Sequence, residues 1–234
     1  MKAVILAGGY GKRLKPYTET VPKPLLPVAE KPILEWQLRW LKHYGFEEVL
    51  ICAGYLKEKL IEEVGSGSRY GVRIGYVVED KPLGTGGALK NAEHILSNEE
   101  TFIVVNGDIL TDLNPNKLLE NMGEKDLGVL ALTPLPSPYG VIKFDSSTLK
   151  ILNFVEKPKI KEYWINAGVY AFRNQVFQYL PEKGDIERTA FPKLAEEGKL
   201  RAALFEESFW MSIDSHKDLE EASKQVPSLS IFTT

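Results

Sequence analysis

Glycines and cations near the start of the chain form a pattern suited to binding a polyanion. Three glycines directly follow an apolar run, and they are Gly8, Gly9 and Gly11. Glycine allows a sharp turn and lets backbone N–H groups approach an anion closely. Arg13 and Lys23 then add positive charge, and the prolines on either side of Lys23 stiffen its backbone. This pattern favours a nucleoside triphosphate as ligand.

The glycines by themselves also fit an ordinary tight turn. They do not form a Walker loop, because no Gly-Lys-Ser/Thr follows, and they lack the third glycine of the dinucleotide fingerprint. The weight of the pattern therefore rests on its two cations. An alternative reading of Arg13 and Lys23 is that they are ordinary surface charges.

A carboxylate stands at a comparable position later in the chain. Asp108 follows a buried apolar run and a glycine. Mg²⁺ prefers one or two carboxylates together with phosphate oxygens, so Asp108 is a candidate metal ligand. The alternative is that Asp108 starts a turn or caps a helix.

Two further polar groups interrupt strand-like runs. Glu156 and Lys157 end one run, where an exposed charge pair is the alternative to a binding role. Asn166 and Gly168 lie within another apolar run, and such residues in a strand indicate close approach of a ligand.

Alternating strand and helix patterns position these residues. Period-two or continuous apolar runs predict strands at 2–7, 48–53, 72–78, 101–105 and 127–132. Helical spacing of apolar residues predicts helices at 33–41, 57–64, 86–96 and 117–122. This alternation predicts an α/β fold with a mostly parallel sheet, helices on both faces, and ligands at the carboxyl ends of the strands.

The pattern changes at the proline-rich segment 134–138, which we interpret as an internal hinge. Short strand-like runs at 140–144, 149–155 and 165–172 then predict a smaller sheet extension that covers the first half and forms the other side of the cleft. The last elements are predicted helices at 174–180, 186–197 and 218–226, a strand at 200–205, and a tail or an interface strand at 227–234. We expect one domain over 1–234, with halves 1–133 and 134–234.

Composition excludes several classes of protein. The 234 residues carry 29 basic and 32 acidic side chains, so the net charge of −3 gives no general attraction to nucleic acid or to anionic membranes. No targeting or membrane-spanning segment is predicted. The single cysteine, Cys52, excludes an internal disulfide and lies in an apolar run, as expected for a buried structural thiol in a cytoplasmic protein.

The opening motif as a whole resembles a known family. Gly-Gly-x-Gly-x-Arg-Leu, then Pro16, then Pro22-Lys23-Pro24-Leu25 is similar to the signature of the sugar-1-phosphate nucleotidyltransferases. The resemblance extends to about Leu219. It implies a Rossmann-like core and one or two Mg²⁺ ions. It assigns Arg13 to the β- and γ-phosphates and Lys23 to the reacting α-phosphate. No C-terminal left-handed β-helix is expected.

The resemblance also assigns the metal ligands. It makes Asp108 a ligand and points to a family motif Trp-x-Asp-x-Gly near the C-terminus. Here the segment is Trp210-Met211-Ser212-Ile213-Asp214, with Ser212 at the usual position of the aspartate. Positions two apart on a strand face the same side, so we expect Asp214 to serve instead. Capping of the following helix is the alternative role of Asp214.

The same resemblance divides the substrate contacts into two sets. The nucleotide-binding residues are Leu6, Ala7, Gly8, Gly9, Gly11, Lys23, Glu79, Gly84 and Thr85. The sugar-phosphate set has Lys157 on the phosphate, Glu156 on the sugar hydroxyls, and a pocket of Gly140, Asn166 and Gly168. Glu79 occupies the base-reading position, where a carboxylate accepts from adjacent guanine N1–H and N2–H donors, so GTP is favoured. A solvated charge is the alternative role of Glu79.

The resemblance and Glu79 together imply the reaction of GTP with mannose 1-phosphate to give GDP-mannose and pyrophosphate. Alternatives are a uridylyl-, thymidylyl- or cytidylyltransferase for glucose 1-phosphate, a heptose-1-phosphate guanylyltransferase, or a regulatory subunit that binds nucleotide sugar without turnover. The expected partners are NTP and a sugar 1-phosphate, with no nucleic acid and no membrane. A homo-oligomer remains open.

Overall fold

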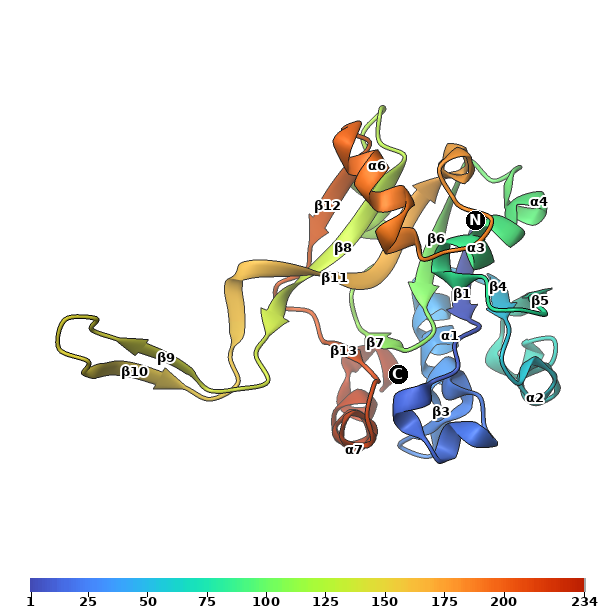
Figure 1. Ribbon diagram of the computed structural model, residues 1–234. Helices are drawn as coiled ribbons and strands as arrows, with labels where there is room; N and C mark the ends of the chain where they lie inside the picture. The colour runs from blue at the N-terminus through green and yellow to red at the C-terminus, as the bar shows by residue number, and fades with distance from the viewer. Residues whose placement is uncertain (234) are drawn as a thin grey trace.

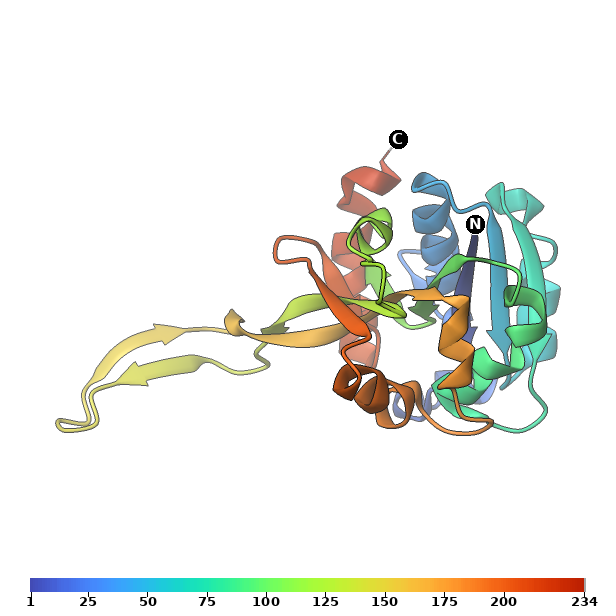
Figure 2. The same ribbon diagram turned by 90° about the horizontal axis from the view of Figure 1, so that it is seen from above.

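A computed structural model describes residues 1–233. It contains a mixed seven-stranded sheet with helices on both faces and a hairpin that projects far from the body (Figure 1 and Figure 2). The sheet order is β12-β8-β11-β6-β1-β4-β5. The predicted α/β architecture with a mostly parallel sheet is confirmed.

The elements have the following bounds. The strands are β1 Lys2–Ala7, β2 Pro27–Val28, β3 Lys31–Pro32, β4 Glu48–Ala53, β5 Arg73–Val78, β6 Thr101–Asn106, β7 Ile109–Thr111, β8 Gly128–Pro136, β9 Val141–Phe144, β10 Ile151–Val155, β11 Lys159–Arg173, β12 Leu200–Leu204 and β13 Trp210–Ser212. The α-helices are α1 Ile33–His43, α2 Lys57–Val64, α3 Gly84–Asn91, α4 Glu93–Leu96, α5 Asn116–Glu120, α6 Ala190–Glu196 and α7 His216–Gln225. The 3₁₀ turns that bear on the site are η1 Lys12–Leu14, η3 Lys23–Leu25 and η6 Ile186–Arg188.

The central strands are buried because they are apolar on both faces. β1 pairs in parallel with β4 and with β6, and β4 pairs in parallel with β5. One face packs against α1, α2 and α5, and the other packs against α3, α4 and α6. The parallel strands therefore end at one edge, where the glycine loop after β1 and Asp108 after β6 both lie.

A third apolar cluster anchors the segments around that edge. Leu14 and Leu26 of the opening loops pack with Leu219 of α7 and Trp36 of α1. This cluster connects the first 30 residues to the C-terminal helix, which are far apart in sequence. It fixes the backbone that carries Arg13 and Lys23.

Several predicted elements differ from the structure. Residues 165–172 belong to β11 in the main sheet, where β11 runs antiparallel to both β6 and β8, and not to a covering extension. The run has this place because Ala167 to Phe172 are buried and apolar. The proline-rich segment 134–138 begins inside β8, which continues through Pro136. The main sheet thus takes strands from both predicted halves.

The C-terminal elements are also shifted. The predicted helix at 186–197 is a 3₁₀ turn, η6, followed by α6, and the predicted helix at 218–226 begins at His216. It begins there because Ser215 and Asp218 form a reciprocal capping box. The described part of the predicted tail forms two 3₁₀ turns. The ring of Phe232 packs edge-on against the ring of Trp36, with 4.9 Å between the ring centroids.

Candidate active site

Lys23 lies at the centre of a charged cluster at the strand edge. Its ammonium donates to Asp108 Oδ2 at 2.7 Å and to Asp214 Oδ1 at 3.2 Å. Only 12% of the Lys23 side chain is exposed, while about 30% of each carboxylate side chain remains exposed. Arg13 donates to the same Asp214 oxygen at 2.7 Å from a largely exposed side chain. The structure thus brings together all four predicted catalytic and metal-binding residues.

Local backbone geometry explains where the two cations point. Gly11 adopts a left-handed conformation (φ 59°) before η1, which carries Arg13. Lys23 opens η3, with Pro22 before it and Pro24 after it, and the Leu25 N–H donates to the Pro22 carbonyl at 2.8 Å. Pro24 is buried, so the turn that carries Lys23 is fixed against the body.

A short strand pair brings Asp214 beside Asp108. β13 pairs antiparallel with β7, and Ser212 lies opposite Ile109. The Ile213 N–H donates to the Asp108 carbonyl at 2.9 Å, so the chain after Ser212 passes directly by Asp108. The Ser212 hydroxyl donates to Asp214 Oδ2 at 2.9 Å, which shows that both side chains face the same side as predicted.

Neither carboxylate caps a helix. Ser215, not Asp214, is the N-cap of α7, and Asp108 lies in the turn that leads into strand β7. Burial raises the pKa of Asp214, but Lys23, Ser212 and Arg13 outweigh burial and lower it below the ordinary aspartate value. Asp214 is therefore held as a carboxylate.

Asp108 and Asp214 fit a Mg²⁺ ion whose remaining ligands are phosphate oxygens and water. Within residues 1–233, no group of three or more His, Cys, Asp or Glu side chains forms a metal cage. Mg²⁺ commonly takes one or two carboxylates and completes its octahedron with phosphate oxygens and water. Asp108 and Asp214, converging on one ammonium beside the glycine loop, match that donor set.

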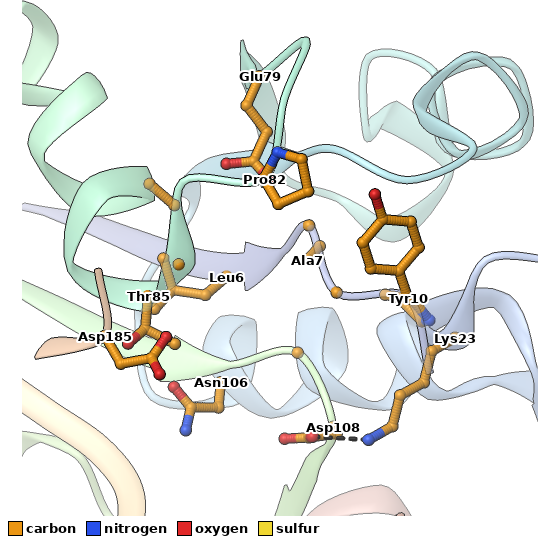
Figure 3. A pocket seen from close by; sticks show the side chains of 16 residues that line it. Leu6, Ala7, Tyr10, Lys23, Glu79, Pro82, Thr85, Asn106, Asp108 and Asp185 are labelled. Carbon is orange, nitrogen blue, oxygen red and sulfur yellow. Dashed lines mark hydrogen bonds and ion pairs between the residues drawn. The ribbon is translucent and has the colours of Figure 1, made fainter. Parts of the chain in front are cut away.

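A cavity of about 270 Å³ extends from this cluster along the glycine loop. Its lining includes the predicted nucleotide-binding residues Leu6, Ala7, Gly8, Gly9, Lys23, Glu79, Gly84 and Thr85, together with Asp108. Glu79 and Pro82 lie on one side of the cavity, and the Lys23–Asp108 pair lies on the opposite side (Figure 3). An adjoining hollow of about 250 Å³ is lined by Gly9, Gly11, Arg13, Lys23, Asp108 and Asp214.

Glu79 is fixed at the far end of the cavity. The Leu83 N–H donates to Glu79 Oε2 at 3.2 Å. Burial raises the pKa of Glu79, and the Leu83 N–H only partly offsets that effect. Glu79 is thus a half-buried acceptor rather than the solvated charge that was its alternative role.

Glycines around Glu79 and at the end of β6 allow close packing at the cavity wall. A methyl group on Gly8 would stand 2.6 Å from Glu79 Oε1, and one on Gly54 would stand 2.5 Å from the same atom. A methyl group on Gly107 would meet the Leu6 carbonyl at 2.6 Å, where the Gly107 N–H also donates to that carbonyl. The wall of the cavity is therefore backbone.

Thr85 connects the cavity to a loop that is distant in sequence. Its hydroxyl donates to Glu187 Oε2 at 2.8 Å and accepts from the Ile186 N–H at 2.9 Å. A methyl group on Gly84 would stand 2.7 Å from the Gly184 backbone. The two hydrogen bonds of the Thr85 hydroxyl hold the loop that contains Ile186 and Glu187. This loop places Asp185 at the cavity.

Asn166 and Gly168 lie in β11 beside the end of β6. The Gly168 N–H donates to Asn166 Oδ1, and Asn166 Nδ2 donates to Tyr170 Oη, both at 2.9 Å. Gly168 has φ 70°, where a side chain is strained, and a methyl group there would stand 3.0 Å from Asn106 Nδ2. The Asn106 Oδ1 atom is buried and has no hydrogen-bond partner within residues 1–233. Gly168 therefore borders the cleft through Asn106, and Asn166 is held beside Gly168 by its hydrogen bonds.

The other predicted sugar-phosphate residues lie elsewhere. Gly140, Glu156 and Lys157 flank β9 and β10 on the projecting hairpin, and Glu156 and Lys157 are exposed and 3.7 Å apart. The structure does not bring them together with the Lys23 cluster. The hairpin projects away from the body instead of covering it, because its own strands pair only with each other (Figure 2).

Sequence reasoning missed seven residues that line the main cavity, namely Tyr10, Pro24, Pro82, Ala88, Asn106, Gly107 and Asp185. Asn106 had a usable signal, since a polar residue that ends a buried strand two positions before Asp108 marks the same edge. Asp185 had none, because η6 reaches the cavity only through tertiary packing.

Residues 2–228 match the model of the nucleotidyl transferase family. The chain is 38% identical over 225 residues to a Danio rerio protein named mannose-1-phosphate guanylyltransferase catalytic subunit beta, covering 93% of this chain and 62% of the relative. It is 34% identical over 251 residues to the UTP–glucose-1-phosphate uridylyltransferase of Synechocystis, covering 99% of this chain and 64% of the relative. The chain thus spans less than two thirds of the length of these relatives.

A solved structure shares the fold. HddC from Yersinia pseudotuberculosis is similar with a TM-score of 0.77 and 26% identity, covering 96% of this chain and 99% of that chain. A second structure of HddC, complexed with GMP-PN, has a TM-score of 0.76. The match over residues 2–228, together with these similarities, shows that the chain belongs to the nucleotidyl transferase family.

Proposed function

We propose that this chain transfers a nucleotidyl group from GTP to mannose 1-phosphate and releases GDP-mannose and pyrophosphate. The observation that carries the proposal is the convergence of Lys23, Asp108, Asp214 and Arg13 beside the glycine-walled cavity. The Danio rerio relative named for mannose 1-phosphate is 38% identical to the chain, which supports this choice of substrates.

The reaction requires charge neutralisation rather than a protein base. A phosphate oxygen of the sugar 1-phosphate attacks the α-phosphorus of the nucleotide in line, and the bond from that phosphorus to the bridging β-phosphate oxygen breaks. Pyrophosphate leaves with the electron pair of that bond. The attacking oxygen is already ionised at neutral pH, so catalysis consists of positioning and electrostatic stabilisation.

The residues divide these tasks. Lys23 binds the α-phosphate, and the exposed Arg13 binds the β- and γ-phosphates. Asp108 and Asp214 would hold one or two Mg²⁺ ions, which would supply Lewis-acid neutralisation of the phosphate oxygens. Lys23 must then release at least one of its two carboxylates when nucleotide and metal bind.

Glu79 supports guanine as the base. Its Oε2 already accepts one backbone N–H, and a carboxylate oxygen has capacity for further donors. Guanine offers two adjacent donors on its edge, whereas uracil offers one donor between two acceptors. The competing assignment, transfer of a uridylyl group to glucose 1-phosphate, is supported by the similarity to the Synechocystis enzyme.

Pyrophosphate release across substrate pairs tests the proposal directly. GTP, UTP, dTTP and CTP are each paired with mannose, glucose and heptose 1-phosphates in the presence of Mg²⁺. We expect the highest kcat/KM for GTP with mannose 1-phosphate. A clear preference for UTP or dTTP refutes the Glu79 argument, and no release with any pair refutes the enzyme reading in favour of a regulatory nucleotide-sugar-binding role.

A matched pair of variants tests the metal assignment. Asp214→Asn keeps the size of the side chain and removes its charge, and we expect a loss of at least about 100-fold in kcat. Asp112→Asn is the control, since Asp112 accepts the Phe209 N–H at 2.8 Å and lines none of the described cavities at the site. Near-normal Mg²⁺-dependent turnover of Asp214→Asn excludes Asp214 as a ligand.

A further inference from the structure

A buried glutamine of α1 contacts the turn that carries Asp108. We call residues 106–109 the Asp108 turn. The side chain of Gln37 is 1% exposed, and its Nε2 atom donates to the Asn106 carbonyl and to the Ile109 carbonyl, at 2.9 Å each. One amide group therefore spans the Asp108 turn from its first residue to its last.

Packing alone does not explain a glutamine at this position. The Oε1 atom of Gln37 is buried and has no hydrogen-bond partner within residues 1–233. Turning the amide over would place this oxygen against two carbonyl oxygens, so the two acceptors set the orientation of the group. A buried acceptor without a partner destabilises the fold, whereas a methionine of similar size would leave none. What Gln37 supplies here is its pair of donors.

The same side of α1 also holds the chain beyond the Asp108 turn. Trp40 Nε1 donates to the Leu113 carbonyl, and Tyr44 Oη, just past the end of the helix, donates to the Asp112 carbonyl, both at 2.8 Å. Gln37, Trp40 and Tyr44 follow one another at helical spacing, which places them on one side of the helix. Side-chain donors of α1 thus fix the whole segment, and Gln37 is the donor to the Asp108 turn.

Backbone hydrogen bonds hold the Asp108 turn from its other sides. The Gly107 N–H donates to the Leu6 carbonyl, and the Asp108 carbonyl accepts from the Ile213 N–H, each at 2.9 Å. The turn is therefore held by β1, by the residue after β13 and by Gln37. Aspartate has a short side chain, so the position of this backbone decides where the carboxylate lies.

We propose that Gln37 is a positioning residue for the metal, because it keeps the Asp108 carboxylate in place beside Lys23 and Asp214. Mg²⁺ demands near-ideal octahedral geometry, so a ligand that shifts binds it poorly. Groups that orient a metal ligand therefore change metal affinity without touching the ion. The proposal rests on the proposed function, in which Asp108 is a metal ligand.

Manganese binding by matched variants tests this role without turnover. Mn²⁺ is the probe, because its electron paramagnetic resonance signal gives a dissociation constant in the absence of nucleotide. Gln37→Met keeps the buried stem and removes both donors, and it should weaken Mn²⁺ binding at least about tenfold. Trp40→Phe is the control, since it removes a buried donor from the same side of α1. It should lower Tm but leave the Mn²⁺ dissociation constant unchanged.

Steady-state kinetics distinguishes positioning from a general loss of structure. In Gln37→Met, the Mg²⁺ concentration for half-maximal pyrophosphate release should rise at least about tenfold, while the KM for GTP at saturating Mg²⁺ should stay near that of the wild type. A general loss of structure would instead lower kcat at every Mg²⁺ concentration without shifting the Mg²⁺ dependence. That result would overturn the proposal.

Hydrogen exchange tests the contact when no metal is bound. The N–H groups of Gly107 and Ile213, which hold the Asp108 turn, should exchange at least about tenfold faster in Gln37→Met than in Trp40→Phe. Equal exchange rates in the two variants would show that Gln37 does not hold the turn.

The wild type provides a further test in case Gln37→Met does not fold. The side-chain N–H resonances of Gln37 should shift when Mg²⁺ is added, while the indole N–H resonance of Trp40 should not. Gln37 resonances that stay in place at saturating Mg²⁺ would overturn the proposal.

These outcomes separate the proposal from the proposed function. If the wild type binds Mn²⁺ and releases pyrophosphate and Gln37→Met does both equally well, the positioning role is refuted and the proposed function stands. If the wild type neither binds Mn²⁺ nor releases pyrophosphate, the metal role of Asp108 is refuted, and the positioning role of Gln37 is refuted with it.

Discussion

Replacing Lys23 by methionine separates the catalytic role of this residue from its structural one. The substitution keeps most of the buried stem and removes the ammonium that contacts Asp108 at 2.7 Å and Asp214 at 3.2 Å. We expect a loss of turnover much larger than the loss of stability, because the other cation of this cluster, Arg13, is largely exposed.

The structure sets the two magnitudes. At an effective dielectric constant of about 20, each contact of the ammonium corresponds to an attraction of roughly 5 kcal/mol, most of which desolvation of the buried ammonium cancels. After the substitution both carboxylates remain about 30% exposed, and Asp214 keeps Arg13, so both can be resolvated. We therefore expect a stability loss of about 1–2 kcal/mol. Loss of a preorganised contact to the reacting phosphate should lower kcat about 100- to 1,000-fold, or roughly 3–4 kcal/mol.

Steady-state pyrophosphate release and thermal unfolding measure the two effects separately. Lys15→Met is the matched control, because Lys15 is an exposed lysine of the same loop that pairs with Glu19 at 3.3 Å and lines none of the described cavities. Its kcat should stay within about threefold of the wild type, in line with the small value of an exposed ion pair.

Metal binding gives an independent readout of the same variant. Without the ammonium, Asp108 and Asp214 should bind Mn²⁺ in the absence of nucleotide at least as tightly as in the wild type. Turnover of Lys23→Met within threefold of the wild type would refute the catalytic role. Loss of Mn²⁺ binding together with an intact fold would refute the view that Lys23 and the metal share these carboxylates.

Three further predictions concern the base-binding side of the cleft. Burial raises the pKa of Glu79, so the ionised form that accepts from guanine is lost as the pH falls from neutral towards that raised value. The KM for GTP should rise on acidification in the wild type and in the control variant Asp80→Asn. In Glu79→Gln the KM for GTP should not change with pH, and the preference for GTP over UTP should be weaker. Gly54→Ala places a methyl group 2.5 Å from Glu79 Oε1 and should raise the KM for GTP about tenfold. If this effect acts through Glu79, Gly54→Ala should not change the KM for GTP further when Glu79 is already replaced by alanine. Thr85→Val breaks two hydrogen bonds and should lower Tm by about 3–6 °C. Thr85→Ser keeps the hydroxyl and should leave Tm unchanged. Equal melting temperatures of Thr85→Val and the wild type would show that the contact to Glu187 contributes nothing to stability.

The sequence carried the information for the nucleotide side of the site. The glycines, Arg13, Lys23 and Asp108 were identifiable because strand ends, glycine loops and proline-flanked turns are local features. Burial of Cys52, which raises the pKa of its thiol to about 12, likewise followed from its apolar run. Asp214 was reachable because a two-residue spacing from Ser212 keeps both side chains on one side, and the hydrogen bond between them bears this out.

Tertiary structure decided what depends on pairing between distant segments. Nothing local distinguishes β11 as a central antiparallel strand, because a buried apolar run fits the middle of a sheet as well as its extension. Asp185 reaches the cavity only because the backbone of Gly84 packs against Gly184.

The direction of the projecting hairpin formed by β9 and β10 also could not be predicted from the sequence. Alternating or continuous apolar residues predict the strands β9 and β10. The same residues are compatible with a hairpin that packs against the body and with one that projects away from it. Residue type and local backbone made Arg13, Lys23 and Asp108 candidates for binding phosphate and metal, and the family resemblance assigned their expected roles. Which distant residues join them was decided by long-range strand pairing, because register and neighbour depend on the free energy of the whole sheet.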